Sequence, residues 1–426
     1  MGGEKMERKK LDYKWVVAAV SFLAVLTALG FCSSSKSLYL DAITNALGIS
    51  RSAFSINDSC RFITTSIVNL FFGTLFARFG AKKLMCAGFV SLIISMFLYS
   101  IGENVFVFYA GGVFLGIGMA WTTTTMVGVV IGNWFKENRG TVMGAVLASN
   151  GLGAALAIQI VSPMIEAHAF GYRDAYRLIM VILLVVGVLV AIFMKDKPKE
   201  DNGTPVSTQK KAKRGQSWAG IEFSAAAKKT YFYAALVCIF ITGLLLQGIT
   251  GISKALMKDT GLDAGYIATV LSMHSIALTV FKFAVGFVYD KKGLRVTSNM
   301  CFITAIIVMF MLANVTNSPT GKVLAMIYGI FSSLALPLET IMLPIYTADL
   351  FGEKSYAKIL GIISSVNTAG YAVGAPLMNL CYDLLGNYNV AIYIGCGLMA
   401  VATIVMQFVI STAHKQRKKI EEETAA

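Results

Sequence analysis

The chain has 426 residues, of which 56% are hydrophobic and only 14% are charged, and its formal net charge at pH 7 is +14. A soluble domain carries about 25% charged residues, so this composition excludes an ordinary soluble protein. Apolar runs of roughly 20 residues, the length that crosses about 30 Å of hydrocarbon, recur along the chain. Twelve such runs are predicted to be membrane helices, at 14–38, 53–77, 84–101, 105–131, 140–163, 174–194, 231–255, 265–289, 297–315, 322–346, 358–382 and 389–411.

Helices are the open-chain structure that satisfies the backbone in lipid, so the fold class is an all-α polytopic membrane protein. Cytoplasmic loops of such proteins carry an excess of Lys and Arg. With the N-terminus inside, 28 basic residues fall in cytoplasmic segments, 5 in external segments and 4 within the apolar runs. We therefore expect a multi-pass protein of the plasma (inner) membrane with both termini cytoplasmic.

The same asymmetry accounts for most of the net charge, so no nucleic-acid partner is expected. The basic loop KKAKRG at 210–215 is predicted to touch anionic membrane lipids. A polar stretch at 195–230 is expected to be a cytoplasmic linker between a six-helix bundle at 1–194 and a second six-helix bundle, with its cytoplasmic tail, at 231–426.

Similar sequences recur in the two halves. GTLFARFGAKK at 73–83 matches GFVYDKKGLR at 286–295, and SKSLYLD at 35–41 matches SKALMKD at 253–259, so that half the chain separates the members of each pair. Repeats of this kind predict two pseudo-symmetric bundles, twelve helices in all.

Ionisable residues inside the apolar runs are candidates for function, because each costs about 2.5–3.5 kcal/mol at mid-membrane. A cavity with more cations than anions attracts an anion and repels cations, which predicts a small organic anion as substrate. The basic members are Lys36, Arg61, Lys254 and Lys282, with His274 titratable, and the acidic members are Asp58 and Glu339.

Lys282 lies eight residues, about 12 Å of helix, from the cytoplasmic end marked by Asp290, too deep to reach water easily. It is predicted to bind the substrate, and the alternative is a structural ion pair with Glu339, which is expected at similar depth. Pro337 and Pro344 flank Glu339 and predict a kink there.

The other charged candidates each have a structural alternative. Lys36 binds substrate or reaches the outer interface, and Lys254 binds substrate or lies nearer bulk water. Arg61 contacts substrate or pairs with Asp58 three residues earlier on the same helical face. His274 is suited to proton coupling or is a hydrogen-bonded residue between helices.

Gly286-x-x-x-Asp290-x-x-Gly293-x-Arg295 resembles the cytoplasmic signature of the major facilitator superfamily, and 73–83 is a second copy with Ala77 where an acid is usual. The resemblance implies a gate in which the acid caps a neighbouring helix end and basic residues latch the cytoplasmic side. The gating candidates are Asp290, Arg295, Gly286, Gly73 and Arg78.

NWFKENRGTVMGAVLASNGLG at 133–153 is similar to a signature of monocarboxylate transporters and of the related oxalate:formate antiporters. FGYRDAY at 170–176 resembles an external segment of both, and KSLYL places Lys36 where monocarboxylate transporters have a lysine. Lys282 stands where both families put a substrate-binding arginine. The resemblance therefore implies a carboxylate substrate and the major facilitator fold.

Two departures shape the expected mechanism. Leu278 stands where monocarboxylate transporters have an acid, so the coupling proton would fall to His274 or Glu339. Asn367 stands where the oxalate transporter has a second cation, and a neutral amide suits one carboxylate better than two. Asn367 matches Asn150 in the other half, and both are predicted to contact substrate.

The sequence thus predicts a monomeric, proton-coupled secondary transporter of a small monocarboxylate such as lactate, pyruvate or formate, working by alternating access. The alternatives are a carboxylate exchanger of the oxalate:formate type and a non-transporting membrane sensor. An enzyme, a cofactor and a metal site are not expected, because metal clusters, phosphate loops and nucleophile–base pairs are not recognisable. The substrate-binding candidates are Lys282, Lys36, Asn367, Asn150, Arg61 and Lys254, and the proton-coupling candidates are His274 and Glu339.

Overall fold

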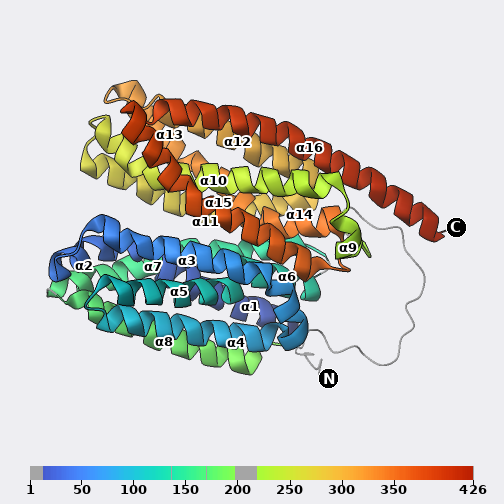
Figure 1. Cartoon of the computed structure of the whole chain (residues 1–426), viewed down its shortest axis with the longest axis horizontal. Helices are drawn as coiled ribbons and strands as arrows, with labels where there is room; N and C mark the ends of the chain where they lie inside the picture. The colour runs from blue at the N-terminus through green and yellow to red at the C-terminus, as the bar shows by residue number, and fades with distance from the viewer. Residues whose placement is uncertain (1–12, 136, 169, 197–217, 426) are drawn as a thin grey trace, which may run out of the picture.

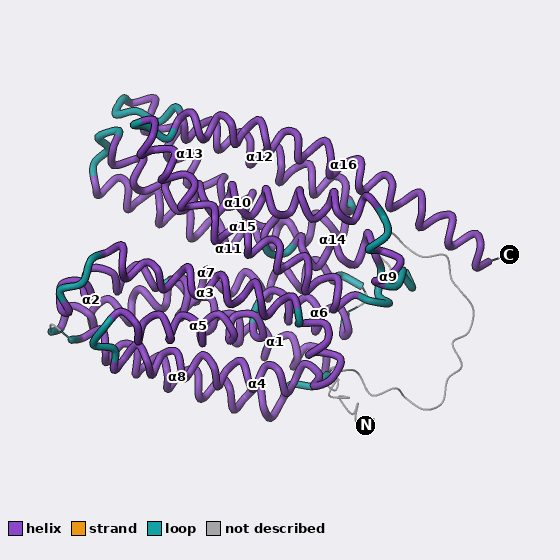
Figure 2. Tube along the Cα trace, in the orientation of Figure 1, coloured by secondary structure: helices purple, strands orange, loops and turns teal. Residues whose placement is uncertain are grey.

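The computed structural model describes residues 13–135, 137–168, 170–196 and 218–425, and Figure 2 shows that these residues form helices joined by short loops. The predicted lipid-contacting loop at 210–215 lies outside the described residues. Two groups of helices, one from each half of the chain, lie side by side with their long axes roughly aligned (Figure 1). This is the all-α, multi-pass architecture that the sequence predicts.

The first group contains ten helical elements, several of which are parts of one membrane crossing. They are α1 (Tyr13–Val25), the π-helix η1 (Leu26–Ser34), the short 3₁₀ turn η2 (Lys36–Leu38), α2 (Tyr39–Leu47), α3 (Arg51–Leu70), α4 (Phe72–Ile101), α5 (Val105–Thr122), α6 (Thr124–Trp134), α7 (Arg139–Ala167) and α8 (Gly171–Phe193). Within α4, Gly80 has a φ of 74° and breaks the helix direction. Glycine is the residue that adopts this conformation without steric cost.

The second group contains the remaining described elements. They are α9 (Phe223–Ala226), α10 (Thr230–Asp259), α11 (Ala264–Lys292), α12 (Leu294–Ala313), α13 (Pro319–Ala335), the 3₁₀ turn η3 (Leu336–Glu339), α14 (Met342–Phe351), α15 (Tyr356–Leu385) and α16 (Asn389–Ala425). The first described residues of α1 and the last of α16 lie at the same end of the molecule, here called the terminal end (Figure 1).

Ten helical segments of the described chain are long and apolar enough to cross a membrane. The long helices α3 and α15 are not among the ten, although they have 20 and 30 residues, because polar side chains interrupt their apolar runs. These two helices lie against each other across the interface between the groups. The most polar membrane helices therefore face the centre of the molecule, where a transported solute would pass.

Helix starts repeat between the two halves. Ser50 caps α3, and Asp263 caps α11 at the corresponding place in the second half, each through a side-chain oxygen that accepts a backbone N–H. Asn104 caps α5 and Ser318 caps α13 in the same way. Such caps satisfy N–H groups that a helix start leaves free. Their placement follows the internal repeat of the sequence.

The two groups touch most closely in their terminal halves. A Cβ atom added at Gly140 or Gly144 of α7 would lie 2.7 Å from the carbonyl oxygen of Gly286 or Lys282 of α11. At the other contact, a Cβ at Gly73 or Gly361 would meet the backbone of Lys358 or Asn69. Glycines thus allow the backbones to approach and close this end of the interface.

Candidate substrate site

A cavity of about 230 Å³ lies between the two groups of helices. Two interrupted membrane crossings border it. In the first half α5 ends at Thr122 and α6 begins at Thr124. In the second half η3 ends at Glu339, and Thr340 and Ile341 separate it from α14, which confirms the kink predicted from the prolines. Paired breaks of this kind in the two halves of a transporter expose backbone and side-chain polar groups to a substrate.

The cavity wall combines apolar side chains with polar ones from both halves of the chain. Its ionisable and amide side chains are those of Arg61, Asn69, Asn150, Gln247, Lys282, Glu339 and Asn367, and its hydroxyl side chains are those of Thr65, Thr123, Thr124, Thr125, Thr250, Thr340, Ser364, Thr368 and Tyr371.

Lys282 is a buried cation with little compensation. Its side chain is 3% exposed, and its Nζ donates one long hydrogen bond, 3.5 Å, to the carbonyl oxygen of Leu147 on the opposite group. Among the described residues, no carboxylate lies within 4 Å of this Nζ, so the predicted ion pair with Glu339 is not formed in this conformation. A buried charge without a partner costs several kcal/mol, which an anion bound in the cavity would offset.

Glu339 ends the 3₁₀ turn η3 and also faces the cavity. It is 6% exposed, and its Oε1 has no hydrogen-bond partner among the described residues. The Tyr371 hydroxyl donates to its backbone carbonyl at 3.3 Å and also lies beside its carboxyl group. Lys282 and Glu339 thus line one cavity as separate, incompletely satisfied charges.

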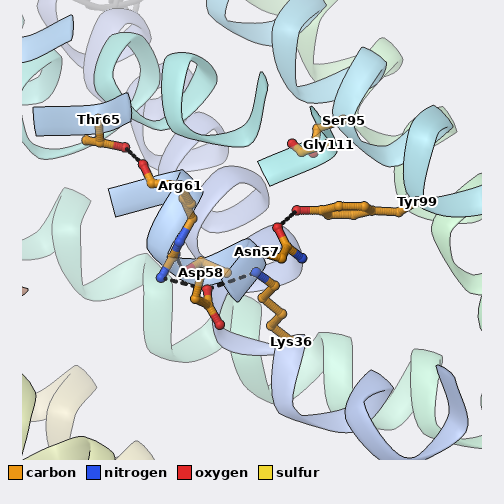
Figure 3. Close-up of polar contacts among 9 residues, drawn as sticks. Lys36, Asn57, Asp58, Arg61, Thr65, Ser95, Tyr99 and Gly111 are labelled. Carbon is orange, nitrogen blue, oxygen red and sulfur yellow. Dashed lines mark hydrogen bonds and ion pairs between the residues drawn. The ribbon is translucent and has the colours of Figure 1, made fainter. Parts of the chain in front are cut away.

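Arg61 and Lys36 share Asp58 in the first group of helices (Figure 3). The Lys36 Nζ lies 2.8 Å and the Arg61 Nη2 3.3 Å from Asp58 Oδ1. Lys36 is 9% exposed and points inward, so it does not reach for the outer interface. Arg61 lines the cavity and Lys36 does not, which places Lys36 behind Asp58 as a support for Arg61.

Hydrogen bonds between neutral groups surround the same charged cluster. Tyr99 and Asn57 are joined by a hydrogen bond of 2.7 Å next to Lys36 (Figure 3). The Thr65 hydroxyl donates to the carbonyl oxygens of Arg61, at 2.9 Å, and of Gly116, at 3.0 Å. These contacts hold the middle of α3 against α5.

The two asparagines both line the cavity. Asn150 Oδ1 accepts from the Ser34 hydroxyl at 2.9 Å, and Asn367 Nδ2 donates to the Ile239 carbonyl at 3.3 Å. Each amide is therefore oriented by a neighbouring helix of its own half, which leaves its other end to face the cavity.

Two other candidates lie elsewhere. His274 Nδ1 is 2.9 Å from the Ser332 hydroxyl and 3.1 Å from the Gly329 carbonyl, in the packing of α11 against α13. Lys254 is exposed near the end of α10. Neither residue belongs to the cavity wall.

Comparison with known proteins settles the family. The family model of the Major Facilitator Superfamily matches residues 20–252 and 235–426, which together span nearly the whole chain. This chain belongs to the Major Facilitator Superfamily. Membership makes it a membrane-embedded transporter rather than an enzyme, as the sequence predicts.

Relatives of this superfamily member include transporters that are named for different substrates. Monocarboxylate transporter 2 of Homo sapiens is 24% identical over 356 residues, which cover 77% of this chain and 71% of the human protein. The hexuronate transporter of Bacillus subtilis is 24% identical over 349 residues, covering 79% of this chain and 76% of that protein.

Solved structures share the fold at low identity. The proton:xylose symporter XylE matches with a TM-score of 0.74 and 13% identity, over 93% of this chain and 96% of that one. The E. coli fucose:proton symporter FucP matches with a TM-score of 0.69 and 16% identity, over 93% of this chain and 98% of that one.

At the terminal end of this facilitator, Asp290 links the two halves. Its carboxylate accepts hydrogen bonds from the backbone N–H groups of Gly140, at 3.0 Å, and Thr141, at 2.7 Å, and from the Thr141 hydroxyl at 2.6 Å. The acid thus caps the start of α7 from the opposite group of helices, where a negative charge is favourable. Gly286 lies at the same contact.

Arg139 forms a second link that the sequence reasoning missed. It is 8% exposed, its Nη1 lies 2.9 Å from Glu353 Oε1 in the other half, and its guanidinium is 4.6 Å from the centre of the Tyr356 ring. The Tyr356 hydroxyl, from the second half, donates a hydrogen bond of 3.1 Å to the Gly128 carbonyl oxygen of the first half. Because Arg139 and Glu353 come from different halves of the chain, no local sequence pattern pairs them.

The segment just before α9 holds the loop that carries Glu353. The Trp218 indole N–H donates to the Asp349 carbonyl at 3.2 Å, and the Trp218 carbonyl accepts from the Glu353 N–H at 3.3 Å. Trp218 is only 7% exposed. The end of the linker is therefore packed against the contact between the two halves.

Of the remaining gating candidates, Gly73 lies against Lys358 of the other half, whereas Arg295 and Arg78 make contacts within one half. Arg295 donates to the Ser411 hydroxyl at 2.8 Å, and Arg78 lies 5.4 Å from the centre of the Phe79 ring. In the copy that has Ala77, the Asp196 carboxylate approaches instead and accepts from the Lys82 N–H at 2.7 Å. Asp196, which follows α8, thus supplies an acid to the loop that lacks one, but it contacts only its own half of the chain.

Proposed function

We propose that this facilitator is a secondary transporter that carries a small organic monocarboxylate anion by alternating access, with Lys282 as the main contact of the carboxylate. The observation that carries the proposal is the burial of the Lys282 ammonium at the cavity without a counter-ion. Arg61 approaches the cavity from the opposite half, so an anion between the two cations would contact both groups of helices. A charge-assisted hydrogen bond from each cation would favour the conformation that brings them together.

The charge of the centre favours a monoanion. Lys36, Arg61 and Lys282 supply three formal positive charges, and Asp58 and Glu339 supply two negative ones, which leaves one net positive charge. While Glu339 is ionised, one carboxylate neutralises that charge, whereas a dicarboxylate would leave a buried negative charge. Asn367, a neutral amide in the cavity wall, agrees with this balance.

We place the protein in the plasma (inner) membrane with both termini in the cytoplasm, as the distribution of basic residues indicates. In that orientation the contacts through Asp290 and Arg139 close the cytoplasmic side, and the described conformation is the outward-facing one. Transport then requires these contacts to break while contacts form at the opposite end.

We assign the coupling proton to Glu339 in preference to His274. Glu339 lines the cavity beside the substrate, whereas His274 is hydrogen-bonded within the packing of α11 and α13. A Glu339→Gln variant should therefore still exchange internal for external carboxylate but lose uptake driven by a pH gradient. Gradient-driven uptake that persists in this variant would remove Glu339 from the coupling step.

The main test is uptake of radiolabelled lactate, pyruvate and formate into proteoliposomes that contain the purified protein. A Lys282→Gln variant should lose uptake at an equal amount of folded protein, while Lys322→Gln, at an exposed lysine in the first turn of α13, serves as the matched control. Normal uptake by the Lys282→Gln variant would refute the proposal. Uptake that occurs only with carboxylate inside the vesicles, and not with a pH gradient alone, would identify an exchanger.

A further inference from the structure

Buried polar atoms without a partner gather at the cavity. Eleven buried side-chain atoms of the described residues have no hydrogen-bond partner, and five of them belong to residues of the cavity wall. The five are Arg61 Nε, Asn69 Oδ1, Glu339 Oε1, Thr340 Oγ1 and Ser364 Oγ. The five atoms have almost no accessible surface in the ligand-free cavity, so a ligand would bond to them after rotation of their side chains. Native proteins satisfy nearly all buried polar groups, and such a concentration points to a ligand that supplies the missing partners.

A carboxylate alone cannot satisfy the hydrogen-bonding needs of all five atoms. Arg61 Nε is a donor and suits a carboxylate oxygen, but the oxygens of an ionised Glu339 carboxylate and the Asn69 carbonyl oxygen only accept hydrogen bonds. They come from opposite halves of the molecule, Asn69 from the end of α3 and Glu339 from η3. A ligand between them must therefore carry hydrogen-bond donors, which formate, pyruvate and other simple carboxylates lack.

We infer that the substrate is a hydroxylated monocarboxylate, whose carboxylate lies at Lys282 and Arg61 and whose hydroxyl groups bond to Glu339, Asn69, Thr340 and Ser364. This inference rests on the proposed function and specifies the substrate class of the same site. While Glu339 is ionised, the net positive charge of the centre favours hydroxyl donors over an ammonium donor, because a zwitterion would leave that charge uncompensated.

The size of the cavity agrees with a substrate of this class. A cavity of about 150 Å³ holds benzene, a molecule of six carbons. The cavity here, about 230 Å³, accommodates a six-carbon acid with hydroxyl groups. A three-carbon acid would leave several of the five unpartnered atoms without contact.

The test compares the binding of three six-carbon probes to the full-length purified protein by isothermal titration calorimetry. D-Gluconate has both the carboxylate and the hydroxyls, hexanoate has the carboxylate alone, and sorbitol has the hydroxyls alone. We expect gluconate to bind at least tenfold more tightly than hexanoate, since hydrogen bonds to buried polar groups are lost with hexanoate. Sorbitol should bind at least tenfold more weakly than gluconate because it cannot compensate Lys282.

The outcomes separate this inference from the proposed function. Hexanoate binding as tightly as gluconate would overturn the hydroxyl contacts and leave a monocarboxylate carrier. Sorbitol binding as tightly as gluconate would overturn the carboxylate assignment itself. An absence of binding by all three probes would overturn the inferred substrate class, while uptake of lactate, pyruvate or formate would still decide the proposed function.

A double variant, Thr340→Val with Ser364→Ala, adds a second readout. Both changes remove an unpartnered hydroxyl with little change in shape, so the ligand-free protein should melt no lower than the wild type. The preference for gluconate over hexanoate should fall at least fivefold. An unchanged preference in a protein that folds normally would contradict the inference.

Discussion

Replacing Asp290 by asparagine should loosen the terminal end of the interface by a predictable amount. The carboxylate accepts three hydrogen bonds from Gly140 and Thr141, two of them from the backbone at the start of α7. A hydrogen bond to a charged group contributes about 1.5–3 kcal/mol and a neutral one about 0.5–1.5 kcal/mol. Asparagine keeps one oxygen acceptor, so the variant should lose about 2 kcal/mol, which corresponds to roughly a 30-fold shift toward the open interface.

Hydrogen–deuterium exchange of the full-length protein measures this shift. Peptides that cover residues 138–150 and 284–292 should exchange about 30 times faster in the Asp290→Asn variant, because these amides exchange when the two halves separate. Peptides from the far end of the same helices should exchange as in the wild type.

The matched control is Asp263→Asn. Asp263 also caps a helix start, accepting from the N–H groups of Gly265 and Tyr266 at 2.9 and 3.1 Å, but it does so within its own loop. This control should accelerate exchange only at the start of α11. If exchange over 138–150 is the same in Asp290→Asn as in the wild type, the acid does not hold the halves together and the reasoning fails.

Three further changes test the packing around the site. Gly144→Leu should abolish uptake, because the larger side chain keeps α7 from packing against α11. The control Gly397→Leu should keep normal uptake, because an added Cβ there has no neighbour within 4 Å. Equal uptake by both variants would argue against closure of the two groups along α7. Lys36→Met should lower the free energy of unfolding by about 1 kcal/mol, or roughly 2 °C in melting temperature. Adding Asp58→Asn should lower it further, because Arg61 then also loses its carboxylate partner. A double variant as stable as the single one would contradict the shared ion pair. Trp218→Ala should speed exchange over 349–355, and unchanged exchange there would show that the linker end does not hold this loop.

The fold and the depth of the central charged residues could be predicted from the sequence, because both follow from residue spacing along single helices. Lys282 is eight residues before Asp290, and the prolines around Glu339 indicate a break, so both residues could be placed near mid-membrane from the chain alone. The internal repeat likewise follows from sequence. The helix caps at Ser50 and Asp263 reproduce it in the structure.

Contacts between distant helices could not be predicted in the same way. A membrane helix is apolar on several faces, so hydropathy does not specify which face meets a neighbour. The inward direction of Lys36 depends on the π-helix η1 and the 3₁₀ turn that follows it, and neither has a reliable sequence signal. The pairing of Arg139 with Glu353 and the approach of Asp196 to the loop at Gly80 depend on how separate helices pack.

The most direct test of the account is the affinity of the Lys282→Met variant for lactate, hexanoate and gluconate, measured beside its melting temperature without ligand. The account predicts that each carboxylate that binds the wild type binds the variant at least tenfold more weakly, because the charge-assisted hydrogen bond is lost. It also predicts that the ligand-free variant melts no lower than the wild type, because a buried charge without a counter-ion has been removed. Unchanged carboxylate affinity would contradict the role of Lys282 as the carboxylate contact.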